Sequence, residues 1–493
     1  MAGAVMNVEG GTSFPAKTTW QVIVCSIIAA CGGLMFGYDI GISGGVTSMD
    51  SFLIKFFHTV YEKKHRAHEN NYCKFDNQLL QLFTSSLYLA AIFASFAASI
   101  VCRKCGRKPT ITLASCFFLV GAVLNFFARN LYMLIGGRIL LGFGIGFGNQ
   151  AVPLFISEIA PAKYRGGLNI IFQFLITVGI LVASIINFFT SKLEDGWKYS
   201  LGGAAVPALI LLFGSFFIYE TPASLIERGK DKKGLKVLRK IRGVEDVTLE
   251  FEEIKRATEL ANQVKQPYRQ LFKRQNLPPF LCGTILQFFQ QFTGINVVMF
   301  YAPVLFQTMG SGSDSSLKSA VVTNLVNALA TIIAICCVDR VGRKALLKEG
   351  AAQMTITQCI IGAILFTHLK VVGPIGSKYA LVVLILICAF VAGFAWSWGP
   401  LGWLVPSEIY PLDVRTAGFF CAVAMNMLCT FIIGQFFLSM MCAFKSFAFF
   451  FFGFWNLVMG ISVWLFLPET KGIPVDEMAE RAWKKHWLWK KFY

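Results

Sequence analysis

Twelve stretches of about 20 mostly apolar residues divide the chain, and each is long enough to cross a bilayer as an α-helix. They lie near residues 20–43, 79–101, 110–128, 131–154, 168–190, 199–219, 279–302, 318–338, 348–367, 379–404, 416–440 and 447–467. Only 15% of the residues are charged, whereas a typical soluble domain has about 25%. A soluble core could not hide this much apolar surface, so we predict an all-α membrane protein and exclude soluble enzymes and nucleic-acid binders.

The positions of Lys and Arg indicate how these spans are oriented. An even number of spans places both termini on one side of the membrane. The loops and tails on that side contain 32 of the 45 Lys and Arg residues, and the opposite loops contain 12. Because basic residues concentrate in cytoplasmic loops, we predict that both termini are cytoplasmic. The net charge of +18 then reflects topology, although the basic segment in mid-chain could also contact anionic lipid.

The chain consists of two repeated halves. The one long charged segment, 220–278, separates the spans into two sets of six, and short motifs recur at matching places on either side of it. The recurring pairs are Gly106-Arg107-Lys108 with Gly342-Arg343-Lys344, and Ser157-Glu158-x6-Arg165 with Ser407-Glu408-x6-Arg415. We predict two six-helix bundles at 1–219 and 279–467, a cytosolic helical linker at 220–278 and a cytosolic tail at 468–493. Such a parallel repeat is typical of transporters whose central site opens alternately to each side.

The repeated charges are predicted to form an inner gate. They lie in loops at the cytoplasmic ends of the spans, where Glu and Arg can pair when the bundles meet and separate when the bundles part. An exposed pair contributes only about 1 kcal/mol, which is enough to bias such an equilibrium. The set comprises Arg107, Glu158, Arg165, Arg343, Glu408 and Arg415. The alternative is that these are ordinary basic-side loop charges.

Two charged residues lie well inside predicted spans. Asp39 lies roughly 6 Å and Arg138 roughly 10 Å below the same outer face, counted at 1.5 Å per residue. Charges are costly in the hydrocarbon region, and their similar depths allow an ion pair. The pair could be purely structural, because removing either partner leaves an uncompensated charge. Alternatively, Asp39 takes up a proton when Arg138 moves away, which would couple proton binding to transport.

A group of uncharged hydrogen-bonding side chains lies near the membrane midplane. Gln290, Gln291, Asn327 and Asn426 are each roughly 14–18 Å deep in a hydrocarbon core about 30 Å thick. Amides donate and accept at once, as the hydroxyls of a neutral polyol do, and aromatic faces suit its C–H groups. The candidate binding residues are Gln173, Gln290, Gln291, Asn296, Asn327, Trp403, Asn426 and Thr430. For any single amide, hydrogen bonding between helices is the alternative.

The cysteines provide one candidate crosslink and no metal site. Cys73 is the only cysteine in the first long outer loop, and Cys442 lies just past the eleventh span at the outer face. An extracellular disulfide could therefore join them. Cys102 and Cys105 have CxxC spacing, but a second pair is missing. Because the sequence contains no metal cluster, nucleophile triad or phosphate loop, we expect no metal, no cofactor and no enzymatic activity.

Taken together, the motifs resemble the sugar porter branch of the major facilitator superfamily, and within it the plant sugar transport proteins, which are monosaccharide/proton symporters. The resemblance covers nearly the whole chain. It rests on Gly106-Arg107-Lys108, Asp339-Arg340-x-Gly342-Arg343-Lys344, Glu220-Thr221-Pro222-x-Ser224, Gln290-Gln291-x2-Gly294-x-Asn296, Gly399-Pro400-x-Gly402-Trp403 and Pro468-Glu469-Thr470-Lys471-Gly472. It implies the major facilitator fold, with 12 transmembrane helices in two six-helix bundles.

The resemblance also implies roles for the residues introduced above. The eight midplane residues would contact a hexose, and Asp39 and Arg138 would be the proton-coupling pair. Residues 44–77 would form a small extracellular lid tied by the Cys73–Cys442 disulfide.

Two further expectations follow from the resemblance. Phe36 and Ile40 would close over the sugar from the outside, beneath the lid. Many relatives have Asp before the Arg of the first inner motif, whereas this chain has Arg103. We therefore expect a weaker inner gate in the N-terminal half.

We expect proton-driven uptake of glucose and other hexoses by alternating access across the plasma membrane, by a monomer in the bilayer with H⁺ as the coupling ion. The alternative within transport is a hexose uniporter, in which the same site works without a proton. Asp39 in the first span argues against the uniporter. A sugar-sensing receptor is disfavoured, because tails of about 19 and 25 residues leave little room for a signalling module.

Overall fold

The computed structural model describes residues 19–65, 72–161, 164–262, 266–309, 312–369, 375–411, 413–473 and 477–493. Within these ranges the regular secondary structure is helical, with no β-strand. Residues 66–71 of the predicted lid and 263–265 of the predicted linker lie outside the described residues.

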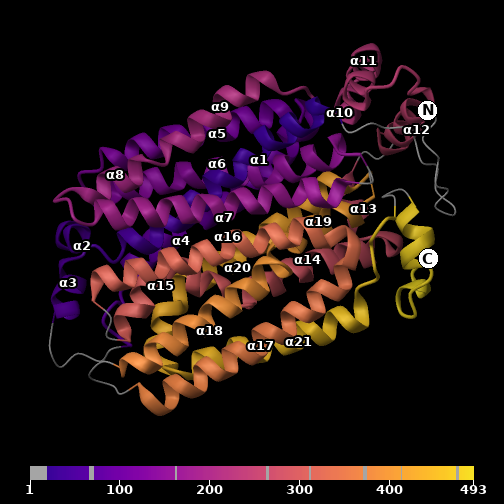
Figure 1. Ribbon diagram of the computed structural model, residues 1–493. Coiled ribbons are helices and arrows are strands. Elements are labelled where there is room, and N and C mark those ends of the chain that lie inside the picture. The colour runs from indigo at the N-terminus through magenta and orange to yellow at the C-terminus, as the bar shows by residue number, and fades with distance from the viewer. Residues whose placement is uncertain are drawn as a thin grey trace, which may run out of the picture.

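Two bundles of membrane-spanning helices lie side by side, with their helices running along the long axis of the molecule (Figure 1). The N-bundle consists of α1 (Trp20–Val46), α4 (Gln78–Lys104), α5 (Arg107–Phe126), α6 (Leu131–Ile159), α7 (Arg165–Thr190), α8 (Gly196–Gly202) and α9 (Ala205–Phe217). The C-bundle consists of α14 (Leu277–Phe292), α15 (Ile295–Thr308), α16 (Ser313–Val341), α17 (Arg343–His368), α18 (Ser377–Ala395), α19 (Trp398–Ile409), α20 (Arg415–Phe444) and α21 (Phe447–Phe466). The bundles meet mainly where α4 packs on α20 and α7 packs on α16.

Eleven helical segments in the described ranges are long and apolar enough to cross a membrane, and two of them are helix pairs, α8 with α9 and α18 with α19. The seventh predicted span, 279–302, is missing from that set because a full break in the helix separates α14, with 16 residues, from α15, with 14. The chain breaks between them at Thr293 and Gly294, where Gly294 adopts φ 87°. Only glycine adopts this left-handed conformation without steric cost. A broken span at membrane depth is tolerated where it lines a cavity.

The tenth predicted span is also broken. α18 ends at Ala395 and α19 begins at Trp398, so the break lies just before Gly399-Pro400. Ser397 takes non-helical angles of φ −127° and ψ −91° there.

Close helix packing explains the glycine-rich stretch of α6. A Cβ at Gly142 would lie 2.2 Å from the Leu87 carbonyl oxygen of α4, and one at Gly144 would lie 2.7 Å from Cβ of Phe118 in α5. Any side chain would therefore force α6 away from both neighbours, and small residues allow the approach.

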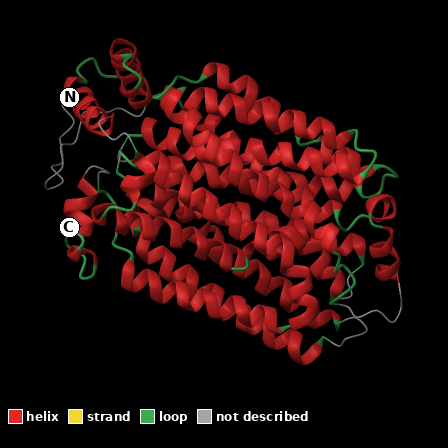
Figure 2. Ribbon diagram, turned by 180° about the vertical axis from the view of Figure 1, so that it is seen from behind, coloured by secondary structure: helices red, strands yellow, loops and turns green. Residues whose placement is uncertain are grey.

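The segments outside the bundles lie at the two ends of the molecule. The lid contains α2 (Asp50–Phe56) and α3 (His58–His65), and α1 continues to Val46, so the lid begins three residues later than predicted. The linker contains α10 (Pro222–Glu227), α11 (Asp231–Arg242), α12 (Thr248–Asn262) and α13 (Pro267–Leu271). Both views show the linker and the C-terminal tail together at the end opposite the lid (Figures 1 and 2).

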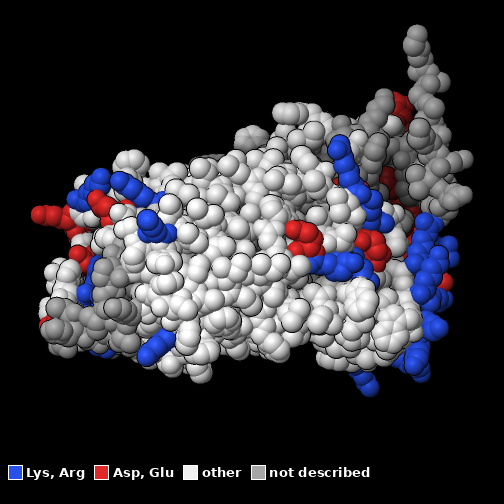
Figure 3. Space-filling model, turned by 60° about the horizontal axis from the view of Figure 1, so that its bottom comes forward, with Lys and Arg blue, Asp and Glu red and all other residues white. Residues whose placement is uncertain are grey.

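The outer surface of the bundles is apolar between two charged ends. Large apolar side chains such as Phe93, Phe213, Phe217 and Trp464 are more than half exposed. Figure 3 shows Lys and Arg gathered at both ends of the molecule, with an uncharged band over most of the face between them. Such a band is what a bilayer covers in a membrane-embedded protein.

Candidate functional site

All eight predicted contact residues line one cavity between the two bundles. The cavity measures about 50 Å³ and takes its walls from α1 and α7 of the N-bundle and from α14, α15, α16, α18, α19 and α20 of the C-bundle. Its predicted lining residues are Gln173, Gln290, Gln291, Asn296, Asn327, Trp403, Asn426 and Thr430, together with Phe36 and Ile40. Ligand pockets usually measure about 300 Å³ or more, so this conformation is too tight for a ligand of ordinary size.

The polar wall of the cavity is a connected set of amides. Gln290 Nε2 donates to the carbonyl oxygens of Trp398 and Gly399 at 3.0 and 2.9 Å. Asn426 Nδ2 donates to Gln290 Oε1 at 2.7 Å, and Gln291 Nε2 donates to the same oxygen at 3.4 Å. Both hydrogens and both acceptor positions of the Gln290 amide are therefore used by protein groups.

Some polar atoms of the cavity have no protein partner. Among the described residues, Asn327 Oδ1 and Asn426 Oδ1 are buried without a hydrogen bond. An unsatisfied buried acceptor costs free energy, and a hydroxyl group in the cavity would satisfy each of these oxygens. Asn296 donates to Gln291 Oε1, and Thr430 Oγ1 donates back to the Asn426 carbonyl at 2.8 Å.

Much of the apolar lining of the cavity was not predicted. Ile176 and Ile180 of α7, Met299 of α15 and Phe394 of α18 also line the cavity. Helical spacing could have identified the first two, because they follow Gln173 by three and seven residues on one face of α7. Phe172 packs edge-on against Trp403 at 5.8 Å between ring centroids, which joins the two bundles beside the cavity.

Gln287 is a further residue that the sequence analysis did not identify. It is fully buried one turn before Gln290 and Gln291, and it donates to the Gly402 carbonyl oxygen. Its Oε1 accepts from Asn426 Nδ2 at 2.5 Å. Gln287 does not line the cavity, but it holds Asn426 in place. Its position three residues before Gln290, on the same face of the helix, could have identified it from the sequence.

Asp39 and Arg138 form a fully buried ion pair in the N-bundle. Arg138 Nη1 donates to Asp39 Oδ1, and both side chains are 0% exposed. Arg138 also donates through Nε to the Phe83 carbonyl at 3.0 Å and through Nη2 to Ser43 Oγ at 2.9 Å. Asp39 Oδ2 is buried with no hydrogen-bond partner among the described residues. The carboxylate therefore has one free oxygen that could bind a proton.

The ion pair lies next to the cavity along α1. Phe36 precedes Asp39 by three residues and Ile40 follows it directly, and both line the cavity. A Cβ at Gly37 would lie 1.9 Å from the Ile176 carbonyl oxygen, so α1 and α7 are in backbone contact here. A shift of α1 at Asp39 would therefore move the cavity wall.

The lid covers the ion pair from the outer end. Phe52 of α2 is fully buried and packs on Phe83 at 5.1 Å between ring centroids and on Trp197 at 6.1 Å. The guanidinium carbon of Arg138 lies 4.9 Å from the Phe83 ring centroid. Phe52 and Phe83 thus connect the lid to the Asp39–Arg138 pair through direct contacts.

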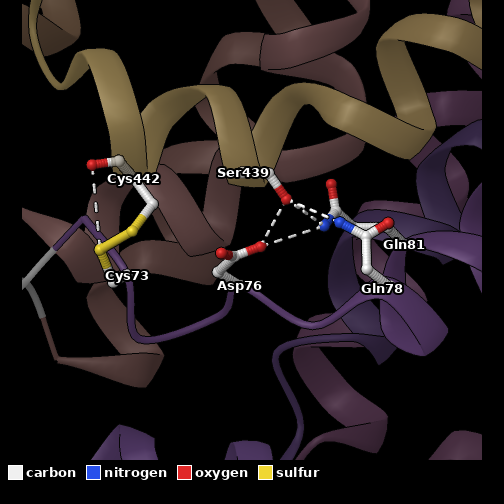
Figure 4. The surroundings of a disulfide bond; sticks show 6 residues. All are labelled: Cys73, Asp76, Gln78, Gln81, Ser439 and Cys442. Carbon is white, nitrogen blue, oxygen red and sulfur yellow. Dashed lines mark hydrogen bonds between the residues drawn. A yellow bond between two sulfur atoms is a disulfide. The ribbon is translucent and has the colours of Figure 1, made fainter.

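A disulfide and a hydrogen-bond network tie the lid and α4 to α20. Cys73 and Cys442 are joined, with their Cα atoms 4.7 Å apart. Asp76 Oδ1 accepts from Ser439 Oγ at 2.6 Å, and Gln78 Nε2 donates to Ser439 Oγ at 2.9 Å (Figure 4). These contacts all cross between the bundles on the outer side.

The inner-gate charges of the N-bundle form a buried cluster beside the linker. Arg107 Nη2 donates to Glu158 Oε1 at 2.8 Å, and Thr221 Oγ1 donates to Glu158 Oε2 at 2.6 Å. The backbone N–H of Arg107 donates to Glu220 Oε1 at 3.0 Å. This carboxylate lies at the N-terminus of α5, where the helix dipole favours negative charge. Gly106 adopts φ 108°, which only glycine adopts without steric cost, and a Cβ there would also lie 2.3 Å from Glu220 Oε2.

The C-bundle repeats this cluster. Arg343 Nη2 donates to Glu408 Oε1 at 2.8 Å, and Thr470 Oγ1 donates to Glu408 Oε2 at 3.0 Å. The backbone N–H of Arg343 donates to Glu469 Oε1 at 2.9 Å, and a Cβ at Gly342 would lie 2.9 Å from Glu469 Oε2. Glu220-Thr221 and Glu469-Thr470 were not predicted to bond these clusters, although both pairs belong to the motifs that carry the resemblance.

Four of the six gate charges differ from the expected pairing between the bundles. Arg107 pairs with Glu158 within the N-bundle and Arg343 pairs with Glu408 within the C-bundle, and Glu158 is in the last turn of α6 rather than in a loop. The side chains of Arg107 and Glu158 are only 3% and 2% exposed, so they are not the weak exposed pairs expected. Glu158 is buried because α6 continues to Ile159, beyond its predicted end at 154, so that Glu158 lies on the helix next to Arg107.

Other groups connect the inner ends of the bundles. The Gly167 N–H of α7 donates to Asp339 Oδ2 of α16 at 3.1 Å, and Asn169 Nδ2 donates to Ser407 Oγ at 3.3 Å. Arg165 and Arg415 are the first residues of α7 and α20. In the N-terminal repeat, Arg103 stands at the position that Asp339 occupies in the C-terminal repeat. An arginine side chain has no hydrogen-bond acceptor, so it cannot form the equivalent of the Gly167–Asp339 bond.

Contacts thus close the cavity on both sides. At the lid end Ser85 Oγ donates to Gln435 Oε1 at 2.6 Å, and at the linker end the Gly167 N–H donates to Asp339 Oδ2. The conformation is occluded, with the predicted binding residues almost entirely shielded from solvent.

Two repeated six-helix bundles around one polar, occluded cavity define a membrane transporter of the major facilitator fold. A family model described as "Sugar (and other) transporter" matches residues 25–482, so the chain belongs to this sugar transporter family. Transporters of this family are not enzymes and need no cofactor.

Individual relatives agree with this assignment. The chain is 73% identical over 496 residues to Sugar transport protein 2 of Arabidopsis thaliana, covering 100% of both chains. Among solved structures, it is similar to the proton:xylose symporter XylE bound to 6-bromo-6-deoxy-D-glucose, with 27% identity, a TM-score of 0.82 and coverage of 94% of this chain and 99% of that chain. The inward-open form of XylE from E. coli gives a TM-score of 0.70 at 26% identity, covering 93% and 99%.

Proposed function

We propose that this protein is a proton-coupled symporter that takes up glucose and other hexoses across the plant plasma membrane by alternating access. The observation that carries the proposal is the buried Asp39–Arg138 pair directly beside the amide-lined cavity, with Asp39 Oδ2 unbonded. The likeness to a proton:xylose symporter supports it. In this proposal both termini are cytoplasmic, the chain acts as a monomer, and Lys and Arg enrichment on the linker side supports that orientation.

Proton binding would act through α1. A proton on Asp39 Oδ2 removes the negative charge that attracts Arg138, which keeps its bonds to the Phe83 carbonyl and to Ser43. Phe36 and Ile40 flank Asp39, so a movement of α1 that follows this loss of attraction changes the shape of the cavity. A sugar that binds the protonated state more tightly than the deprotonated state shifts the equilibrium between them toward the protonated state. The size of the shift is set by the difference between the two affinities.

Sugar recognition would rest on the amide wall. Hydroxyl groups of the sugar would donate to the unbonded Oδ1 atoms of Asn327 and Asn426, while Gln290 and Gln287 hold Asn426. The apolar faces of the sugar would pack on Trp403, Ile176 and Ile180. A site without charged lining residues suits a neutral polyol, and the described cavity has none.

Coupling to one proton supplies a measurable driving force. One elementary charge moving through 100 mV is worth about 2.3 kcal/mol, which corresponds to roughly 40-fold accumulation. A uniporter would only equilibrate the sugar. Accumulation of labelled glucose in cells that lack their own hexose carriers therefore separates the two functions.

The decisive variant is Asp39→Asn. We expect it to lose both accumulation and acid stimulation of uptake while retaining counterflow exchange of labelled for unlabelled glucose, because exchange needs no net proton movement. Asp195→Asn is the matched control, since Asp195 is an exposed acid in the connection between α7 and α8. Persistent acid-stimulated accumulation by Asp39→Asn would show that Asp39 is not the coupling site.

Orientation is tested separately. Epitope tags at either terminus should bind antibody only after the plasma membrane is permeabilised. Binding to intact cells would contradict the proposed topology without affecting the coupling test.

A further inference from the structure

A second cavity lies on the outer surface of the C-bundle, between α14 and α21. It measures about 270 Å³ and is lined by Leu281, Ile285 and Phe289 of α14 and by Val463 and Phe466 of α21. It shares no residue with the sugar cavity. Ile285 is 44% exposed, so the groove opens to the surface that the bilayer covers.

The C-terminal tail closes the inner end of this groove. Leu488 and Trp489 line it, and Trp489 Nε1 donates to the Phe466 carbonyl oxygen at 2.6 Å. Trp487 Nε1 donates to the Leu465 carbonyl oxygen at 3.0 Å, although its ring is 57% exposed. The tail is therefore fixed to the last turn of α21, and the exposed indole is of the kind that prefers the membrane interface.

Three basic residues adjoin the part of the tail that lines the groove. Lys490 and Lys491 follow Trp489 directly and are exposed, and Arg274 donates to the Lys491 carbonyl oxygen. Among the described residues, these three form no ion pair with Asp or Glu, whereas Lys484 pairs with Glu480. Figure 3 shows Lys and Arg concentrated at this end of the molecule.

We propose that the groove and these cations form a binding site for an anionic glycerophospholipid. One acyl chain would lie between α14 and α21, and the phosphate and headgroup would contact Lys490, Lys491 and Arg274. An apolar slot that ends in cations matches both parts of such a lipid, and anionic lipids are enriched in the cytoplasmic leaflet. Only the assignment of the leaflet rests on the proposed orientation.

The test measures lipid retention by the full-length protein. The protein is reconstituted in nanodiscs of phosphatidylcholine and phosphatidylserine at 4:1, extracted into detergent, and examined by native mass spectrometry. We expect phosphatidylserine to be retained over phosphatidylcholine, corrected for its share of the bilayer. Each lysine near an anionic surface contributes about 1 kcal/mol, or roughly fivefold, so Lys490→Gln/Lys491→Gln should lower this preference at least fivefold.

Two further variants test the position of the charge and the groove separately. Lys192→Gln/Lys378→Gln removes the same charge from exposed lysines at the opposite end of the molecule and should leave the preference unchanged. Ile285→Trp fills the groove and should reduce retention of phosphatidylserine. Counterflow of glucose, measured for every variant, verifies that each protein is folded.

Three results would overturn the proposal: equal retention of the two lipids by the unmodified protein, unchanged preference in Lys490→Gln/Lys491→Gln, or an equal loss of preference in the Lys192→Gln/Lys378→Gln control. None of these results depends on proton coupling, so failure of the lipid site and failure of the proposed transport function can be distinguished.

Discussion

At the scale of single residues, the binding cavity depends on side chains that hold other side chains. Gln290 uses all of its amide on protein partners, and Gln287 supports Asn426 from one turn away. The atoms left free for a ligand are few, and Asn327 Oδ1 and Asn426 Oδ1 are two of them. Affinity for sugar should therefore be sensitive to residues that the sugar itself does not touch.

Gln290→Ala tests this dependence. The substitution leaves Asn426 Nδ2 and Gln291 Nε2 without their shared acceptor, and unsatisfied buried groups cost about 1–3 kcal/mol. We expect the KM for glucose to rise by roughly 10- to 100-fold in uptake assays. Gln358→Ala, a buried amide of α17 outside the cavity, should change KM little. An unchanged KM in Gln290→Ala would contradict the positioning role.

At the scale of helices, the breaks in two spans create the site. The turn between α14 and α15 places Gln290 and Gln291 before the break and Asn296 after it, so amides from both half-helices face one cavity. The break between α18 and α19 brings the Trp398 and Gly399 carbonyls to Gln290. In one continuous helix Gln291 and Asn296 would be five residues, or about 140°, apart around the axis, so the break is what brings their amides into contact.

Gly294→Ala should disturb the first break. Gly294 has φ 87°, and an added Cβ would lie 2.9 Å from the Phe452 ring. A non-glycine residue in this conformation costs about 1–2 kcal/mol, so we expect a lower thermal unfolding temperature and weaker glucose binding. Gly312→Ala is the control, because Gly312 has φ −62° and nothing within 4 Å of an added Cβ. Equal stability of the two variants would contradict the requirement for glycine at the break.

At the scale of the whole molecule, alternating access requires contacts on each side of the cavity that can be broken in turn. At the lid end the breakable contacts include the Ser85–Gln435 and Gln78–Ser439 hydrogen bonds, and at the linker end they include Gly167–Asp339 and Asn169–Ser407. The Cys73–Cys442 disulfide is covalent and does not break when the bundles part. The contacts at the linker end are hydrogen bonds alone, so they are the easier set to disrupt by substitution.

Asp339→Ala removes one inner contact and also the ion pair with Arg343 at 3.0 Å. We expect the inner ends to part more often, which raises amide hydrogen exchange in the first turn of α7, measured by mass spectrometry. Asp314→Ala is the control on the same helix, since Asp314 is an exposed acid in the first turn of α16 at the other end. If exchange in α7 is the same in both variants, the Gly167–Asp339 bond does not hold the inner side closed.

The sequence was sufficient to predict an all-helical membrane protein, the repeat of the two halves, and the polar residues that line the cavity. Span length and hydropathy determine whether a segment crosses a bilayer, and depth along a span places Gln290, Asn327 and Asn426 at one level before any helix contact is known. The same counting placed Asp39 and Arg138 close enough to pair.

Only the tertiary structure decided which groups touch. It pairs Arg107 with Glu158 and Arg343 with Glu408 inside each bundle, assigns Gln287 a supporting role, and adds the apolar wall of Ile176 and Ile180. Periodicity along one helix gives the depth and face of a residue, but the partner on another helix depends on how the bundles are rotated and where each helix ends. Those quantities are set by packing between distant segments, so they appear only when the chain is folded.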